Sequence, residues 1–343
     1  MNKHPRQNHD LIGHDAAQQQ IVQAINGGRL PHAWLITGAE GVGKATLAYR
    51  FARAVLAGKK NVSDLSVSPD ASAAKLMAAS SHPDLMILER PFDEKKGRYL
   101  QNIPVDDVRK IAPFLRLTAS QGSARVVIVD GAGTLGRAGQ NAILKTLEEP
   151  PENAIIILTA ESAAVLLPTI RSRCRVLKLE RLSEEHLLTI AAQNELTENL
   201  DFILKIADGS ASKLLRYSAC DANVLYQNWC DFLKTPHSTA LRMKMAEGWS
   251  GRNNDDVYFT AQEMMFSWLQ RLINAKARGT LPEPLVPPEI AMLQAVYGRL
   301  SLERMLQLWE NLREQASDAE HHNLDRKVVL LSMFDKTANL LAG

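Results

Sequence analysis

A phosphate-binding loop is the feature that most constrains how this chain folds. Residues 34–47 read WLITGAEGVGKATL, and four of them fill the pattern G-x-x-x-x-G-K-[ST] up to its last position: Gly38, Gly41, Gly43 and Lys44. Glycines here let backbone N–H groups wrap a polyphosphate at a helix N terminus, and the lysine adds a positive charge. An apolar run precedes the loop, and apolar residues at helical spacing follow it as far as Gly58. The sequence therefore predicts the strand, loop and helix of a P-loop fold.

The last position of this motif lacks the hydroxyl that normally holds Mg²⁺. Ala45 stands where a Ser or Thr is expected. Thr46 offers a hydroxyl, but one further residue turns a side chain by about 100° around a helix. We therefore expect a phosphate cradle that is missing a metal ligand.

A second motif of the same kind of site is also incomplete. Residues 125–135 read RVVIVDGAGTL, which predicts a buried parallel strand that delivers the carboxylate of Asp130 to a Mg²⁺ site. ATPases of this type usually follow that Asp with a Glu that polarises the attacking water, but Gly131 stands here. A hydrolytic site needs a base within hydrogen-bond reach. Taken alone, Asp130 fits a turn residue at a strand end; together with Ala45 it predicts a degenerate nucleotide site that does not hydrolyse ATP.

A longer segment carries a family resemblance. From Gln140 the chain reads QNAILKTLEEPPENAIIILTAESAAVLLPTIRSRCRVLKL, which resembles the clamp-loader branch of the AAA+ superfamily, and within it the delta-prime type of bacterial DNA polymerase III subunit. The resemblance runs from about Leu11 to Leu215 and includes LPHAWLITG and HPDL at 82–85. It implies an α/β fold: an AAA+ P-loop domain with a parallel five-stranded sheet, a small helical lid and an all-α C-terminal collar domain.

The same resemblance assigns a role to Arg173. Ser172, Arg173 and Cys174 match the SRC motif of clamp loaders, in which the arginine is a finger projected into the ATP site of the adjacent subunit. A guanidinium suits that task because it stays charged and offers a planar fork to phosphate oxygens. Arg171 and Arg175 flank it. Without the motif, such a cluster would be interpreted as a solvated surface or a surface ion pair.

Two glutamates at the end of the segment's first predicted helix are unusual. Glu148 and Glu149 precede Pro150, which ends the helix, and the helix macrodipole disfavours acids at this end. Either simple solvation or a contact with a neighbouring subunit would account for them.

The predicted organisation has three domains: 1–180 for the P-loop domain, 181–220 for the lid and 221–343 for the collar. The candidate strands are Ala33–Thr37, Leu85–Leu88, Arg125–Asp130, Ala154–Leu158 and Val176–Leu179. Ser212 stands where active AAA+ subunits carry a sensor arginine on the lid. Four of the five tryptophans lie beyond residue 220, and we interpret them as core or interface anchors.

Composition excludes several classes of function. A net charge of +2 excludes a chain that binds DNA by overall charge alone. The 3 cysteines are far apart, and no apolar run reaches the length of a membrane span, so we expect a cytoplasmic protein with no membrane contact. Many clamp-loader subunits insert a four-cysteine zinc module after the P-loop helix. Residues 58–81 contain no cysteine, so we expect no zinc.

The leading hypothesis is a non-hydrolysing, stator-like clamp-loader subunit that supplies Arg173 to a neighbouring ATPase subunit. The implied partners are the delta and gamma/tau subunits, with the sliding clamp and primed DNA reached through the complex. No cofactor is then required, although weak or vestigial ATP binding is possible through Gly38, Gly41, Gly43, Lys44, Thr46 and Asp130. The alternatives are an ATP-hydrolysing motor subunit of the gamma/tau type and an unrelated P-loop kinase or DNA-repair ATPase.

Overall fold

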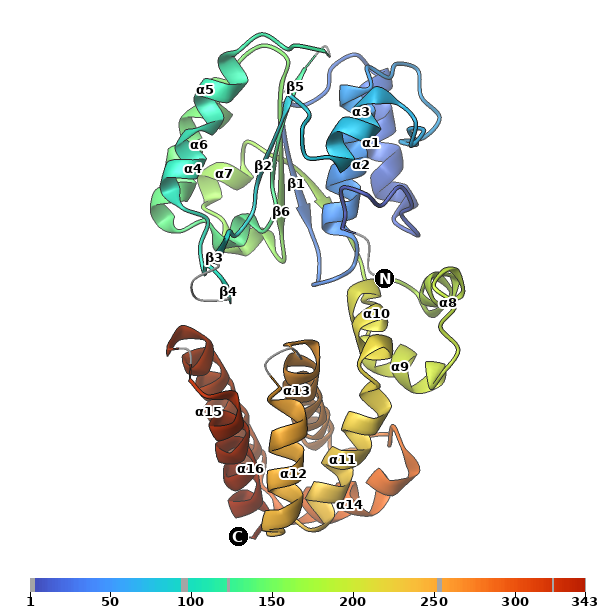
Figure 1. Cartoon of the computed structure of the whole chain (residues 1–343), viewed down its shortest axis with the longest axis vertical. Helices are drawn as coiled ribbons and strands as arrows, with labels where there is room; N and C mark the ends of the chain where they lie inside the picture. The colour runs from blue at the N-terminus through green and yellow to red at the C-terminus, as the bar shows by residue number, and fades with distance from the viewer. Residues whose placement is uncertain (1–3, 94–97, 122–123, 252–254, 323, 343) are drawn as a thin grey trace. The chain divides into compact units, whose positions relative to one another are not determined.

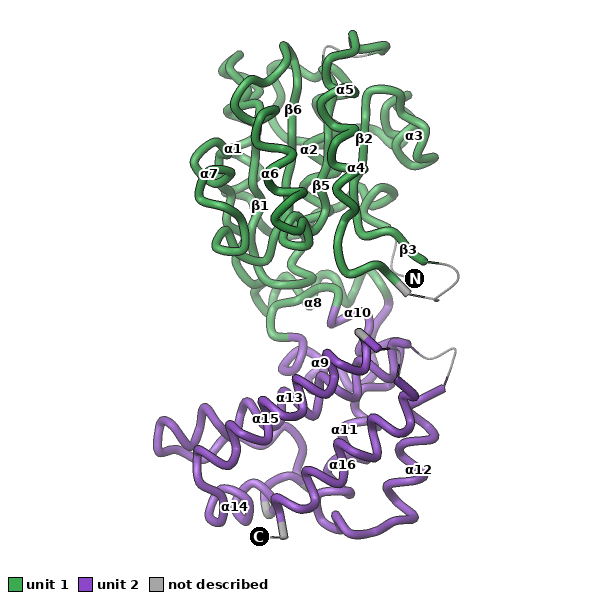
Figure 2. The backbone as a smooth tube through the Cα atoms, turned by 90° about the vertical axis from the view of Figure 1, so that its left-hand side faces the viewer, with its two compact units in different colours: residues 1–194, 208–212 green, residues 195–207, 213–343 purple. Residues whose placement is uncertain are grey.

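The chain forms two compact units in a computed structural model that describes residues 4–93, 98–121, 124–251, 255–322 and 324–342. Unit 1 contains residues 1–194 and 208–212, and unit 2 contains residues 195–207 and 213–343 (Figure 2). The division into three domains with boundaries near 180 and 220 stays a prediction.

Unit 1 is built on a five-stranded parallel sheet in the order β2-β5-β6-β1-β7 (Figure 1). The strands are β1 (Ala33–Thr37), β2 (Leu85–Leu88), β5 (Arg125–Val129), β6 (Ala154–Ala160) and β7 (Arg175–Lys178). The predicted fold class, a parallel α/β sheet followed by an all-α C-terminal region, is confirmed. Four predicted strand ends were wrong by one or two residues: β5 ends before Asp130, β6 continues to Ala160, and β7 begins at Arg175 and ends at Lys178.

Both faces of the sheet are buried because successive side chains alternate between two apolar cores. Trp34 and Ile36 of β1 enter the core on one face, whereas Leu35 enters the core on the other. The first face is covered by α1 (Asp15–Asn26), α2 (Lys44–Leu56) and α3 (Ser72–Ala78). The second is covered by α4 (Val105–Arg109), α5 (Ile111–Arg116), α6 (Arg137–Glu148) and α7 (Pro168–Arg171).

The segment after the P-loop helix folds by apolar packing. Leu65, Val67 and Met77 are buried in the core beside α2, so residues 58–81 are anchored by hydrophobic side chains. The polar stretch between Pro91 and Pro104 contains the short antiparallel strands β3 (Phe92–Asp93) and β4 (Arg98–Tyr99).

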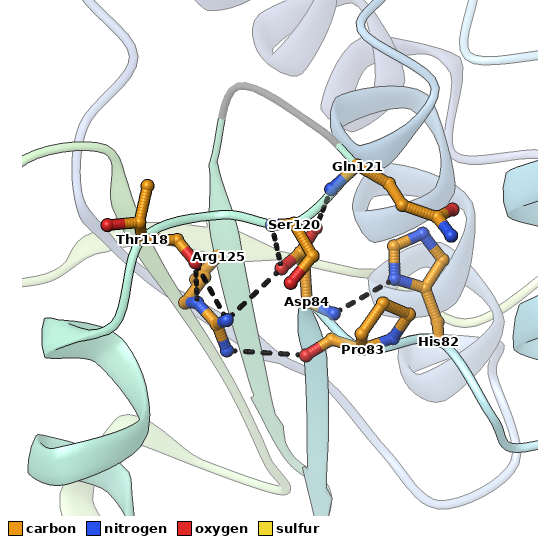
Figure 3. A network of polar contacts seen from close by, with 7 residues as sticks. All are labelled: His82, Pro83, Asp84, Thr118, Ser120, Gln121 and Arg125. Carbon is orange, nitrogen blue, oxygen red and sulfur yellow. Dashed lines mark hydrogen bonds and ion pairs between the residues drawn. The ribbon is translucent and has the colours of Figure 1, made fainter.

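A buried ion pair fastens the sheet to the loop before β5 (Figure 3). Asp84 is fully buried, and its carboxylate accepts hydrogen bonds from the backbone N–H groups of Ser120 and Gln121, both at 2.8 Å. Arg125 Nη2 lies 3.4 Å from Asp84 Oδ1, and the same guanidinium donates to the carbonyl oxygens of Thr118 and Pro83. The HPDL sequence thus supplies the carboxylate that joins β2 to residues 118–121.

Three short helices follow the sheet in sequence: α8 (Glu184–Gln193), α9 (Leu200–Ala207) and α10 (Ala211–Ala219). Ser183 is the N-cap of α8, because its hydroxyl accepts a hydrogen bond from the His186 N–H, as N-cap serines do. Short 3₁₀ turns occur at η1 (Ala132–Thr134), η2 (Ala163–Val165) and η3 (Pro287–Glu289).

The remaining helices of unit 2 pack around an aromatic core. They are α11 (Ala222–Lys234), α12 (Thr239–Trp249), α13 (Asp255–Arg278), α14 (Ile290–Arg299), α15 (Leu302–His322) and α16 (Arg326–Ala342). Trp229, Trp249 and Trp268 are at most 3% exposed. The ring of Trp229 contacts that of Trp268 directly, and Phe334 lies against both Trp229 and Trp249. Three of the four C-terminal tryptophans are therefore core residues. No helix within the described residues is long and apolar enough to cross a membrane.

Candidate functional site

The phosphate-binding loop lies between β1 and α2, as the sequence predicted. Gly38, Gly41 and Gly43 have φ values of 154°, 73° and 109°, which residues other than glycine rarely adopt. Lys44 is the first residue of α2, so its ammonium is placed beside the helix N terminus. The backbone therefore has the form that a phosphate cradle needs.

The ammonium of Lys44 is bound by the loop itself. Its Nζ donates hydrogen bonds to the carbonyl oxygens of Gly38, at 2.8 Å, and Ala39, at 2.7 Å. Burial lowers the pKa of Lys44, and the nearby carboxylates of Glu161 and Asp130 oppose this effect. A phosphate would have to compete with two carbonyl oxygens for the same ammonium.

The loop at 209–212 closes against the phosphate-binding loop. The N–H of Ser212 donates to the carbonyl of Gly41 at 3.2 Å. A Cβ added at Gly41 would collide with the hydroxyl groups of Ser210 and Ser212. Ser212, which occupies the position of a sensor arginine by resemblance, is thus in contact with the loop that such an arginine would serve.

Asp130 follows β5 directly, and its carboxylate has a partner within the chain. Oδ1 accepts a hydrogen bond of 2.6 Å from the hydroxyl of Thr159, which in turn accepts the N–H of Gly131 at 2.8 Å. Sequence reasoning missed Thr159. The available signal was its place just after the apolar residues Ala154 to Leu158, at the carboxyl end of the strand beside β5.

These residues fit phosphate oxygens better than a bound Mg²⁺. Ala45 offers only a methyl group, and the carboxylate of Asp130 is hydrogen-bonded to Thr159. Thr46, one residue further along α2, is half-buried. Of the two protein ligands that P-loop ATPases give the metal, one is absent and the other is engaged.

The N-terminal residues Leu11 and His14 lie beside this loop. Nε2 of His14 is 2.7 Å from the carbonyl oxygen of Val42, and Leu11 approaches Gly43. Burial lowers the pKa of His14, although its hydrogen bond to Val42 acts in the opposite direction. The neutral imidazole therefore donates to this carbonyl at ordinary pH.

The three arginines around the SRC motif have different surroundings. Arg173 Nη2 lies 2.9 Å from Glu148 Oε1, and Nη1 donates to the carbonyl of Thr169 at 2.9 Å. The guanidinium of Arg175 lies over the ring of buried Trp34, with Cζ 5.2 Å from the centroid. Arg171 is exposed at the end of α7. Arg173 is thus distinguished by its pairing with a carboxylate.

Glu148 has a contact within the chain that neither expectation included. Its side chain is exposed, which fits solvation, and it also forms an intrachain ion pair with Arg173; a contact with a neighbouring subunit stays a prediction. Glu149 is exposed beside it. Cys174 packs against the core under α6, and burial raises the pKa of its thiol to about 12, so it is a packing residue.

Within the ranges that the structure describes, no group of three His, Cys, Asp or Glu side chains is arranged to hold a metal ion. The absence of zinc stays a prediction.

A model of the family described as "DNA polymerase III, delta subunit" matches residues 13–183. The subunit delta' of Pseudomonas aeruginosa is 35% identical over 46% of this chain and 46% of its own length. The delta' of Haemophilus influenzae is 34% identical over 57% of each chain, and that of Escherichia coli is 33% identical over 62% of this chain and 60% of its own length. The matches thus span about half the length of these curated relatives.

Gamma and tau subunits and two solved structures are also similar to this chain. The gamma subunit of Buchnera aphidicola (subsp. Schizaphis graminum) is 30% identical over 64% of this chain and 62% of its own length. A gamma subunit-related protein of Thermotoga maritima covers 94% of this chain and 98% of its own at 18% identity, with a TM-score of 0.42. The RuvB branch migration motor of the same organism covers 79% of each chain at 16% identity, with a TM-score of 0.41. At these TM-scores neither superposition adds to what the sheet order establishes.

The family match covers the phosphate-binding loop, Asp130 and the SRC motif in one continuous stretch. The chain therefore belongs to the delta-prime family of DNA polymerase III clamp-loader subunits.

Proposed function

We propose that this chain is a non-hydrolysing, stator-like subunit of a DNA polymerase III clamp loader. In this role it joins delta and gamma/tau subunits and helps to load the sliding clamp onto primed DNA. Family membership supports the complex, and the chemistry of two sites supports the particular role. One is the chain's own nucleotide site, and the other is Arg173.

The observation that carries the proposal is the state of the nucleotide site. Lys44 is bound to two carbonyl oxygens of its own loop, and Ser212 is hydrogen-bonded to Gly41. Hydrolysis also needs a metal ligand at Ala45 and a base near Gly131, and neither residue can act as one. The site therefore retains a weak phosphate cradle at most, without the groups for turnover.

Arg173 supports the second part of the proposal, a contribution to hydrolysis in a neighbouring subunit. Its side chain is 34% exposed, so its guanidinium is accessible to a neighbouring subunit. Arg175 is committed to Trp34, which leaves Arg173 as the arginine that the SRC resemblance and the geometry both favour. A guanidinium there would stabilise charge that develops on the γ-phosphate of a neighbouring ATP.

The alternative is an ATP-hydrolysing motor subunit. Similarity to gamma and tau subunits favours it, since the gamma subunit match spans more of this chain than the matches to the delta' relatives described above. Glu161 also lies close enough to Lys44 to oppose the lowering of the lysine pKa by burial, so a carboxylate is present near the loop. The missing hydroxyl at Ala45 weighs against this function.

The test is ATP turnover and clamp loading by complexes reconstituted with delta and gamma/tau subunits. We expect Arg173→Ala to leave assembly intact and to slow DNA-stimulated hydrolysis. Arginine fingers of small GTPases raise the hydrolysis rate by a factor of about 10³–10⁵. A complex with several ATP sites should lose a smaller factor in total hydrolysis when one finger is removed. Arg173→Lys should restore only part of the rate, because an ammonium lacks the planar fork.

Arg171→Ala is the matched control, since it removes an exposed arginine two residues away. Its complex should hydrolyse ATP at a rate closer to that of the unmodified complex. Normal hydrolysis by the Arg173→Ala complex would refute the finger.

A further inference from the structure

We propose that Glu148 is a positioning residue that aligns the guanidinium of Arg173 for the neighbouring ATP site. This inference rests on the proposed function of Arg173 as a finger. It assigns a role to a carboxylate that the SRC motif does not include and that lies 25 residues earlier in the sequence.

The position of Glu148 on its helix is the first observation. Glu148 is the last residue of α6, where the helix macrodipole disfavours a negative charge. The ion pair with Arg173 compensates for that cost, because the guanidinium lies 2.9 Å from Glu148 Oε1. The acid and the finger are thus complementary, although Glu148 ends α6 and Arg173 lies in the turn between α7 and β7.

The second observation is that Arg173 is held from two sides. Nη2 faces Glu148, while Nη1 donates to the carbonyl of Thr169 and to the hydroxyl of Ser172, at 2.9 and 3.3 Å. A guanidinium has five N–H groups, and these contacts with described residues use three of them. The side chain is therefore restricted in rotamer while N–H groups remain for phosphate oxygens.

Exposure sets the size of the effect. The Arg173 side chain is 34% exposed and that of Glu148 is 46% exposed, so water screens the pair. An exposed pair of this kind changes a conformational equilibrium by up to about fivefold. We therefore expect Glu148 to raise the population of the aligned rotamer severalfold, which is far less than the contribution of the finger itself.

The experiment compares the unmodified complex with five variants reconstituted with delta and gamma/tau subunits: Glu148→Ala, Glu148→Gln, Glu149→Ala, Arg173→Ala and the double change to Ala at 148 and 173. Single-turnover hydrolysis and ATP affinity are measured separately, and thermal unfolding checks that each variant is folded. Glu149→Ala is the matched control because it removes the same charge from the adjacent, exposed position. Glu148→Gln retains an oxygen acceptor without the charge.

We expect Glu148→Ala to slow the hydrolysis step about two- to fivefold at unchanged ATP affinity, Glu148→Gln to be intermediate, and Glu149→Ala to match the unmodified complex. In the Arg173→Ala background, Glu148→Ala should have no further effect. A structural role would slow hydrolysis by the same factor in both backgrounds.

Three outcomes would overturn the inference and leave the finger intact, provided that Arg173→Ala is slow. They are a normal rate from Glu148→Ala, an equal loss in both backgrounds, and a faster rate, which would make Glu148 a restraint. A normal rate from Arg173→Ala would refute the proposed function itself, and the role of Glu148 with it.

Discussion

Removing the carboxylate of Asp84 should destabilise unit 1 more than any surface substitution. The carboxylate is fully buried, accepts two backbone N–H groups at 2.8 Å and lies 3.4 Å from Arg125, whose side chain is 8% exposed. Breaking a buried ion pair by removing one partner costs about 3–5 kcal/mol, because the other charge stays buried. Arg125 keeps its bonds to the carbonyl oxygens of Thr118 and Pro83. We therefore expect Asp84→Ala to cost about 3 kcal/mol, the lower end of that range.

Hydrogen exchange measures this loss within unit 1 alone, which matters because the chain has two compact units. Val126 is a suitable reporter, since its N–H donates to the backbone carbonyl of residue 84 inside the sheet. Asp70→Ala is the control: its carboxylate is 90% exposed and pairs with Lys75 at 3.1 Å, so the expected loss is about 0–1 kcal/mol. A loss below about 1 kcal/mol for Asp84→Ala would refute the interpretation of the network as a buried ion pair.

Two further predictions concern the nucleotide site. The purified chain should release no phosphate from ATP above background, because Ala45 cannot bind Mg²⁺ and Gly131 cannot act as a base; turnover that is abolished by Lys44→Ala would contradict this. Burial lowers the pKa of His14 below 6.5 in the folded chain, so its contribution to stability is present above pH 6.5 and is lost as the pH falls through the folded-state pKa. His14→Gln should reduce the loss of unit 1 stability on acidification, as measured by hydrogen exchange between pH 7 and pH 5, and an unchanged pH dependence would exclude His14 as its source.

The sequence predicted the sheet well because its strands are uniform in character. The strands β1, β5 and β6 are apolar runs that are buried along their whole length, so period and composition alone identify them. Their ends were less certain. Asp130 directly follows β5, and Arg175 is the first residue of β7. A polar side chain at such a position is compatible with the strand either ending or continuing, and backbone pairing decides between these outcomes.

The polar contacts of the sites could not be predicted, because they join residues that are distant in sequence. Asp84 is recognisable within HPDL, yet its backbone partners lie 36 and 37 residues later. Glu148 ends α6 and Arg173 lies in the turn after α7, and the packing of α6 against α7 brings them together. Thr159 has no motif of its own and gains its contact from the pairing of β5 with β6.

We expect this chain's own nucleotide site not to hydrolyse ATP and Arg173 to act on the ATP site of a neighbouring subunit. The most direct measurement compares ATP hydrolysis by two reconstituted complexes, one with Lys44→Ala and one with Arg173→Ala in this chain alone. We predict unchanged hydrolysis for Lys44→Ala, because that ammonium is bound to the carbonyl oxygens of Gly38 and Ala39, and slowed hydrolysis for Arg173→Ala. The opposite pattern, with Lys44→Ala slow and Arg173→Ala normal, would contradict the account and identify the chain as a motor subunit.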